Sequence, residues 1–325
     1  MHLGRRLLAG GIAVASALGA LSATAGEFPE RAMTIVVPFA PGGSIDVIAR
    51  LLGKGMSDRL GQPVVIENKS GAAGVTGADF AAKASPDGYT MVLATSSSIA
   101  IMPHLMAKLP FDPRTDLEPI TLVARVQELL VTHAGSGIAS ARELAAGAKA
   151  EPGKLTYGSA GVGGITHLAG ELFKREAGID MVHVPYRGSA PAVVDLLAGR
   201  ITASILDNTA FLQHVRAGTL KPLMVPSQTR LALLPDVPTA SEAGFPSVLS
   251  DNWNALDVAA SVPADVRAKL HAAATAALRS KDVADAIAAQ GGTASPSTRA
   301  ELATFAAGER ARWETVVRSA NVKLE

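Results

Sequence analysis

The sequence predicts an α/β protein in which mostly parallel sheets are flanked by helices. Short β-type runs alternate with Ala- and Leu-rich helical runs along most of the chain, and several strand-to-helix turns are rich in glycine and serine. Two longer β-rich segments, residues 119–132 and 248–260, interrupt this alternation. We therefore expect two domains joined by two β-type crossings, with a ligand cleft between the domains that closes on a ligand.

The crossings divide the expected elements between the two domains. Domain I takes residues 26–125 plus 250–325, and domain II takes residues 126–249. Domain I is expected to hold strands 34–37, 63–67 and 91–95 and helices 45–60, 77–84, 263–289 and 299–320. Domain II is expected to hold strands 155–158, 180–183, 203–206 and 220–225 and helices 166–178 and 191–198.

Residues 1–25 have the three parts of a secretory signal peptide. Arg5 and Arg6 form a positive n-region, residues 7–21 are apolar and rich in small residues, and Ala23 and Ala25 form an A-x-A cleavage site. A membrane anchor is the alternative, but the run is short and the cleavage site follows at once. We therefore expect export to the periplasm and a soluble mature protein of 300 residues.

Composition excludes several classes of function. The chain has 30 basic and 29 acidic residues, and loss of Arg5 and Arg6 leaves 28 against 29, so no basic face for nucleic acid is expected. It has no cysteine, which excludes disulfides and cysteine nucleophiles. None of the seven histidines forms an H-x-x-x-H or H-E-x-x-H pair, so we expect no metal site and no cofactor.

The turn between the first strand and the first helix is the most informative motif. Phe39, Pro41, Gly42 and Gly43 precede Ser44 and Asp46 at the expected start of the helix. Such a turn directs backbone N–H groups and the positive end of a helix dipole at one place, which suits a carboxylate or another anion. The alternative is a tight turn in which Asp46 only caps its own helix.

Four other strand ends carry similar polar turns. Ser96 and Ser97 follow the third strand, and their hydroxyls either bind a ligand or cap a helix. Arg187 follows a later strand and either pairs with an anion or lies on the surface. A glycine-rich turn supplies Ser159, Gly161, Gly164, Thr166 and His167, and a further strand end supplies Asp207 and Asn208. Because ligands of open α/β sheets lie beyond the carboxyl ends of the strands, we expect all these groups except Arg187 to bind the ligand.

Enzyme motifs are missing, although a spatial triad stays open. The glycine-rich turn fits neither the G-x-G-x-x-G dinucleotide pattern nor a phosphate loop, and no G-x-S-x-G elbow exists. A Ser–His–Asp triad assembled in space remains possible from sequence alone. We expect a binding protein rather than an enzyme, with a periplasmic hydrolase as the less favoured alternative.

These motifs, in this order, resemble the Bug family, the TctC-like substrate-binding proteins of tripartite tricarboxylate transporters. The resemblance covers nearly the whole mature chain. It is carried by MTIVVPFAPGGSIDVIAR, GQPVVIEN, SPDGYT, LPFDP, VHVPYRGSAP and LLPDVPTASEAG.

The resemblance implies a two-domain periplasmic-binding-protein fold of the second type that captures a small organic carboxylate. It also implies partners: the membrane permease subunits of a tripartite tricarboxylate transporter or, alternatively, a membrane signalling protein that senses the ligand. We expect a monomer. Arg125, Gln127, Glu128 and Asp257 put polar and charged side chains near the crossings, so aromatic and amidated carboxylates stay open as ligands.

Overall fold

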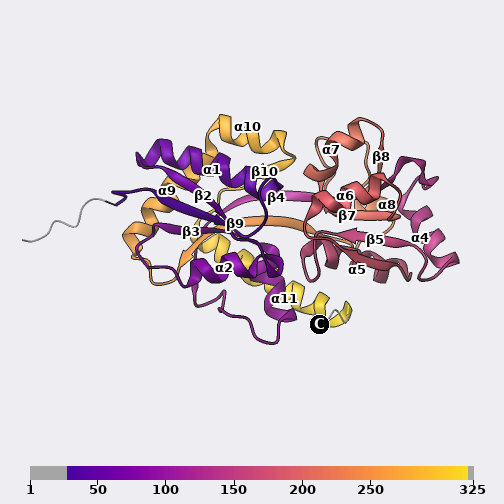
Figure 1. The fold of residues 1–325 in the computed structure, drawn as a ribbon, viewed down its shortest axis with the longest axis horizontal. Helices are drawn as coiled ribbons and strands as arrows, with labels where there is room; N and C mark the ends of the chain where they lie inside the picture. The colour runs from indigo at the N-terminus through magenta and orange to yellow at the C-terminus, as the bar shows by residue number, and fades with distance from the viewer. Residues whose placement is uncertain (1–27, 321–325) are drawn as a thin grey trace, which may run out of the picture.

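The computed structural model describes residues 28–320, and the expected signal peptide lies outside this range. Figure 1 shows an elongated molecule with two α/β lobes side by side. A ten-stranded sheet runs through both lobes in the order β2-β1-β3-β9-β4-β7-β5-β6, with β8 and β10 also paired to β4. The two-lobed α/β architecture agrees with the sequence prediction.

The first lobe is built around the strands that pair with β1. Strand β1 pairs in parallel with both β2 and β3. Strand β9 runs antiparallel to β3 and to β4, and β10 runs antiparallel to β4. Its strands are β1 (Met33–Val37), β2 (Val64–Asn68), β3 (Thr90–Thr95), β9 (Asp251–Ala259) and β10 (Gly292–Ala294). Its helices are α1 (Ser44–Leu60), α2 (Val75–Ala82), α3 (Met102–Leu105), α9 (Ala264–Arg279), α10 (Lys281–Ala289) and α11 (Arg299–Ala320), with shorter turns at Ala72–Gly74 and Ser97–Ile101.

The second lobe repeats the strand–helix alternation on a smaller scale. Strand β5 pairs in parallel with β6 and β7, and β7 and β8 run antiparallel to β4. Its strands are β5 (Thr156–Ser159), β6 (Val182–Pro185), β7 (Ala203–Asp207) and β8 (Leu220–Met224). Its helices are α4 (Ala141–Ala150), α5 (Ile165–Ala177), α6 (Ser189–Leu197), α7 (Asn208–Arg216) and α8 (Ala240–Ala243), with a short turn at Ala134–Ser136.

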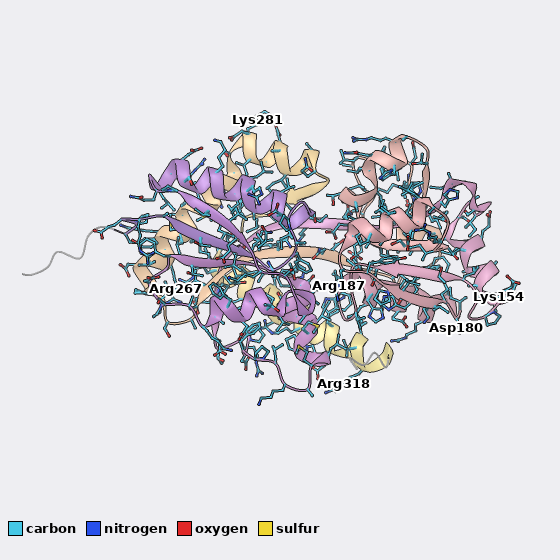
Figure 2. All side chains as sticks on the ribbon, in the orientation of Figure 1. Lys154, Asp180, Arg187, Arg267, Lys281 and Arg318 are labelled. Atoms are coloured by element: carbon cyan, nitrogen blue, oxygen red, sulfur yellow. The ribbon has the colours of Figure 1, made fainter. Side chains whose placement is uncertain are left out.

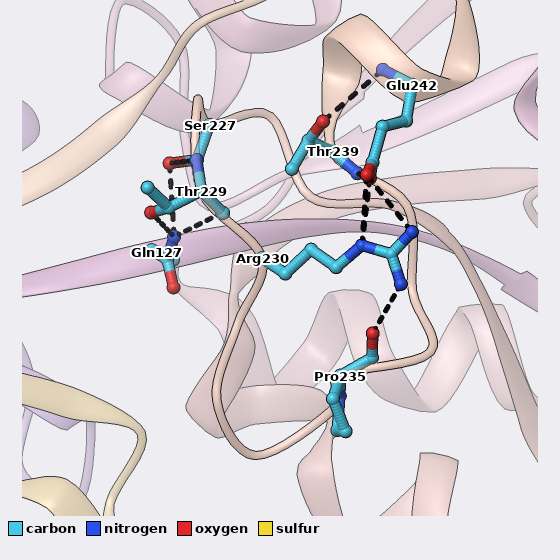
Figure 3. A network of polar contacts seen from close by, with 7 residues as sticks. All are labelled: Gln127, Ser227, Thr229, Arg230, Pro235, Thr239 and Glu242. Atoms are coloured by element: carbon cyan, nitrogen blue, oxygen red, sulfur yellow. Dashed lines mark hydrogen bonds and ion pairs between the residues drawn. The ribbon is translucent and has the colours of Figure 1, made fainter.

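Strand β4 (Leu117–His133) belongs to both lobes and is 17 residues long. Its first part pairs with β9 and β10, and its second part pairs with β7 and β8. Gln127 lies between these parts and donates from its amide to Ser227 Oγ and to the carbonyl of Thr229, as Figure 3 shows. The segment that returns from β8 toward β9 is thereby fastened to the middle of β4.

Each lobe has its own apolar core, and one apolar cluster extends between the lobes. Leu52, Leu93 and Leu270 are fully buried in the first lobe, and Phe173 is almost fully buried in the second. A further cluster joins Trp313 of α11 to residues of α5, so α11 packs against both lobes. The elements before β4 and helices α9 and α10 lie together in the first lobe, and the expected domain bounds stay predictions.

Two local differences from the sequence prediction have physical reasons. The helix expected over residues 263–289 is two helices, because Ser280 has an extended ψ of 139° that ends α9 and begins α10. The strand expected at residues 180–183 lies at Val182–Pro185, where its pairing with β5 sets the register.

Candidate functional site

The lobes meet at what we call the interlobe interface, formed by Ser44, Ser97, Ile165 and Asp207. Ser44 Oγ donates to Asp207 Oδ2 at 2.7 Å, and the backbone N–H of Ile165 donates to Ser97 Oγ at 3.1 Å. Ser44 begins α1 and Ile165 begins α5, so the N-termini of two helices from opposite lobes reach this interface. These hydrogen bonds join the first turn to the end of β7 and the glycine-rich turn to the end of β3, and the binding of one ligand by all four segments stays a prediction.

Both helices begin with a glycine N-cap that offers no side-chain acceptor. Gly43 caps α1 with φ −78°, and Gly164 caps α5 with φ −76°, so both have an extended backbone. In the first lobe, the N–H groups of Gly43, Ser44 and Ile45 donate to no acceptor within residues 28–320. Free N–H groups at a helix start are the usual receptor for an anionic group.

Asp46 supports the first turn and has no free acceptor directed at a ligand. Its Oδ2 accepts from the N–H of Gly42 and from Arg50, and its Oδ1 accepts from Arg50 and Asn68, each at 3.0 Å. Burial alone would raise the pKa of Asp46, but these donors hold it below its usual value. Asn68 also donates to the carbonyl of Phe39. Asp46 therefore holds the turn before α1 without capping that helix, and its contact with a ligand stays a prediction.

The glycine-rich turn of the second lobe is supported by neutral rings. The imidazoles of His167 and His183 stack at 3.8 Å between ring centres, and Tyr157 stacks on His183 at 4.9 Å. Ser159 Oγ lies 2.7 Å from His183 Nε2, and the N–H of Gly163 donates to His167 Nδ1. Burial and, to a smaller extent, the charge of Lys174 lower the pKa of His167 to about 4. Burial and then the neighbouring His167 lower the pKa of His183 to about 3.

Thr166 and Gly161 fix the same turn from within. Thr166 Oγ1 accepts from the N–H of Ala160, and the N–H of Gly161 donates to Ser159 Oγ. His167, Thr166 and Ser159 are therefore all engaged inside the turn. Their predicted ligand contacts stay predictions, and in the described conformation the three side chains position the backbone of the turn.

Asp207 occupies the centre of the interlobe interface. Asn252 Nδ2 donates to both carboxylate oxygens of Asp207, and Ser96 Oγ donates to Asn252 Oδ1. Burial raises the pKa of Asp207, while Ser44 and Asn252 partly offset this effect. Asn208 instead faces the crossing, because its amide donates to the carbonyls of Gln127 and Gly291.

Four contributors to this region were not among the predicted site residues. They are Asn68, Glu128, His183 and Asn252. Asn252 lies at the start of the second crossing. A polar side chain in a strand expected to be buried could have indicated this residue from the sequence. His183 and Asn68 carried no signal, because only the sheet register brings them to their partners.

Arg187 is exposed and donates no hydrogen bond to any other described residue. In the view of Figure 2 its label lies close to where the two lobes meet.

Within residues 28–320 no group of three or more His, Asp or Glu side chains could hold a metal ion, and no helix has the length and hydropathy to cross a membrane. A cavity of about 500 Å³ lies beneath α11 and is lined by none of the predicted ligand residues.

Comparison with known proteins decides the family. The model of the tripartite tricarboxylate transporter family receptor, TctC, matches residues 48–322. The chain belongs to this family. BugT of Bordetella pertussis is 39% identical over 326 residues, which covers 100% of both chains.

Solved structures of similar proteins have the same fold. The periplasmic binding protein BugD is 30% identical with a TM-score of 0.85, covering 92% of this chain and 100% of its own. A Rhodopseudomonas palustris protein solved with adipate is 32% identical with a TM-score of 0.87, covering 91% and 99%. MatC from the same species, solved with malate, is 32% identical with a TM-score of 0.83, covering 89% and 100%. The predicted family and the two-domain periplasmic-binding-protein fold are confirmed.

Proposed function

We propose that this TctC protein is a periplasmic receptor that captures a small organic carboxylate between its lobes for a tripartite tricarboxylate-type transporter. The observation that carries the proposal is that the glycine-capped N-termini of α1 and α5, which belong to opposite lobes, both reach the interlobe interface. Membership of a transporter-receptor family and the adipate and malate of two relatives support the same ligand class.

The binding mechanism follows from the donors at these helix starts. The free N–H groups of Gly43, Ser44 and Ile45 would hold a carboxylate of the ligand, aided by the α1 dipole. Gly161, Gly164 and the backbone near His167 would approach from the second lobe on closure. Exclusion of water strengthens each of these hydrogen bonds, so the closed form is the one that the ligand stabilises.

The domains follow the crossings in this proposal. Residues 26–125 plus 250–325 form domain I and residues 126–249 form domain II, with 1–25 removed as a signal peptide on export. The ligand-loaded closed shape is what the membrane permease subunits would recognise. No residue is assigned a catalytic role.

The Ser159–His183 pair is the feature that a hydrolase would use. However, a histidine whose pKa is lowered to about 3 by burial and by His167 is a weak general base at neutral pH. His183 is also fixed by stacking between Tyr157 and His167. These properties favour a supporting role for His183 over a catalytic one.

A thermal-shift screen of small carboxylates followed by calorimetry tests the proposal. A ligand that binds only the folded protein raises its melting temperature by mass action. Gly43→Phe should lower affinity at least tenfold while the unliganded protein still folds. Gly43 has φ −78°, and only the Ala40 carbonyl, at 3.9 Å, lies within 4 Å of a Cβ added there, so the backbone accepts a side chain at this position.

Gly43→Ala is the matched control, and it should keep most of the affinity. Unchanged affinity in Gly43→Phe would remove the α1 N-terminus from the binding site. Conversion of the bound carboxylate to a product, detected by mass spectrometry after incubation, would favour the hydrolase instead.

A further inference from the structure

The cavity beneath α11 lies in the first lobe, between this helix and the segment that leads into β4, and has a volume of about 500 Å³. Pockets that bind small molecules have volumes of about 300–1,000 Å³, so this cavity is large enough for a small metabolite. Its lining includes Leu117 at the start of β4, Asp257 of β9, and Leu302 and Arg310 of α11. None of the residues that form the interlobe interface lines it, so it is a separate place on the molecule.

Asp257 lies on the face of β9 that is directed toward α11. Side chains alternate between the two faces of a strand. Ala255 belongs to the apolar cluster that includes α11, whereas Leu256 and Val258 belong to the cluster on the other face. Asp257 is 4% exposed, and its Oδ2 has no hydrogen-bond partner within residues 28–320. Its neighbour on β4 is Pro119, which has no N–H to donate. A buried, unpartnered oxygen in the wall of a cavity indicates a missing ligand or ordered water.

Three other ionisable side chains that line the cavity are already paired. Arg114 donates to both carboxylate oxygens of Asp112, and this contact lowers the pKa of Asp112 to about 2. Arg299 and Arg267 both form ion pairs with Glu118. The protein itself therefore supplies a partner for Arg114, Glu118 and Arg299, which leaves two ionisable lining groups among the described residues.

The two remaining groups are Asp257 and Arg310, and they carry opposite charges. Arg310 is half-buried and forms no hydrogen bond or ion pair with another described residue, Asp257 included. Burial lowers the pKa of Arg310 and raises that of Asp257 to about 7, although the charge of Arg310 offsets part of this rise. Both groups are thus partly removed from water without a partner that would compensate for the loss.

We propose that the cavity beneath α11 is a second binding site, for a small zwitterion whose carboxylate binds Arg310 and whose ammonium group binds Asp257. A guanidinium offers paired donors to a carboxylate, and an ammonium group offers three donors to the oxygens of Asp257. One ligand of this kind would supply both missing partners at once. The site lies within the first lobe, so this inference does not depend on the proposed function.

The experiment compares zwitterions with molecules that lack one of the two charges. Calorimetry at pH 7 measures dissociation constants for the ω-amino acids from glycine to 6-aminohexanoate, which find the best length. At that length the matching carboxylate and the matching amine are then measured; for four carbons the probes are 4-aminobutanoate, butanoate and butylamine. We expect the zwitterion to bind at least ten times more tightly than either singly charged probe.

Substitutions at each end of the site test the two contacts separately. Asp257→Asn should reduce the preference for the zwitterion over the carboxylate at least tenfold, and Arg310→Gln should do the same for its preference over the amine. Arg310→Lys keeps the charge and should keep part of the affinity. Arg318→Gln is the matched control, because Arg318 also lies on α11 but is exposed, pairs with Glu314 and does not line the cavity; Figure 2 labels it. Its affinity should equal that of the unsubstituted protein.

The outcomes separate this inference from the proposed function. Zwitterion binding should persist in Gly43→Phe, which alters only the interlobe site. If Gly43→Phe abolishes that binding while Arg310→Gln leaves it unchanged, the zwitterion binds between the lobes and this inference is wrong, whereas the receptor function stands. Failure of every zwitterion to bind would also overturn it, since ordered water alone would then fill the cavity. Equal losses in Arg318→Gln and Arg310→Gln would overturn it as well, because the net charge of α11 would explain them. If carboxylates fail to bind between the lobes, only the proposed function fails.

Discussion

The two turns that meet at the interlobe interface have similar backbones but different supports. Each follows a parallel strand and leads to a glycine-capped helix. In the first lobe the support is ionic, since Asp46 binds Arg50 and the N–H of Gly42. In the second lobe it is a neutral stack of His167 and His183. The same anion-binding geometry can therefore be stabilised by charge or by packing, and the two supports should fail under different conditions.

The largest expected effect breaks the support in the second lobe. Gly170→Ala places a Cβ 2.1 Å from Cε2 of Tyr157, the ring that stacks on His183. Overpacking of this kind costs about 1–3 kcal/mol in the free energy of unfolding. Gly308→Ala is the control, because nothing lies within 4 Å of its Cβ in α11. It should stabilise by about 0.5–1 kcal/mol through helix propensity. Chemical denaturation measures the free energy of unfolding of both variants. Equal free energies in Gly170→Ala and Gly308→Ala would show that the Tyr157 ring moves freely.

The next prediction separates the supports by pH. An unfolded histidine binds its proton near pH 6.5, whereas His167 and His183 do so at about 4 and about 3 in the folded protein. Between pH 6.5 and these lower pKa values, the unfolded chain therefore binds more protons than the folded protein. The contribution of the two histidines to the free energy of unfolding is thus lost as pH falls from about 6.5. Asp46 has a lowered pKa, so its contribution is lost only as pH falls below about 3.8.

Melting temperatures between pH 4.5 and 7.5 check this difference. His183→Gln should flatten the decline on the acid side, since glutamine does not titrate. His214→Gln, on α7 away from the stack, controls for the loss of a histidine. An identical decline in the unsubstituted protein and in His183→Gln would contradict the neutral-stack interpretation.

The smallest effect is expected for Arg50→Ala, which removes the exposed partner of the ionic support. The side chain of Arg50 is 54% exposed while that of Asp46 is 4% exposed. Because water screens the exposed partner, Arg50→Ala should cost at most about 1 kcal/mol in the free energy of unfolding. Asp46→Ala should cost more, about 1–3 kcal/mol, because it also removes the acceptor of the Gly42 N–H and one of the two acceptors of the Asn68 amide. Equal losses in the two variants would mean that the ion pair alone supports the turn.

The sequence predicted the architecture well because the strand–helix alternation and the crossings are local patterns. It also located both glycine-capped turns, because Gly43 and Gly164 are visible in the sequence between a strand and a helix. It could not show that Ser159 would pair with His183 or that Asp207 would bind Ser44, because those contacts depend on sheet register and on how the lobes meet. Single side chains at a site are therefore harder to predict than the turns that carry them.

The length of β4 has a mechanical consequence. A strand of 17 residues extends for about 55 Å, and both halves of the sheet depend on its hydrogen bonds. Unfolding of either lobe would leave half of β4 without its neighbouring strands, so we expect the protein to unfold in a single cooperative step. We therefore expect any movement of one lobe relative to the other to bend or twist β4, because this strand continues without a break from the first lobe into the second.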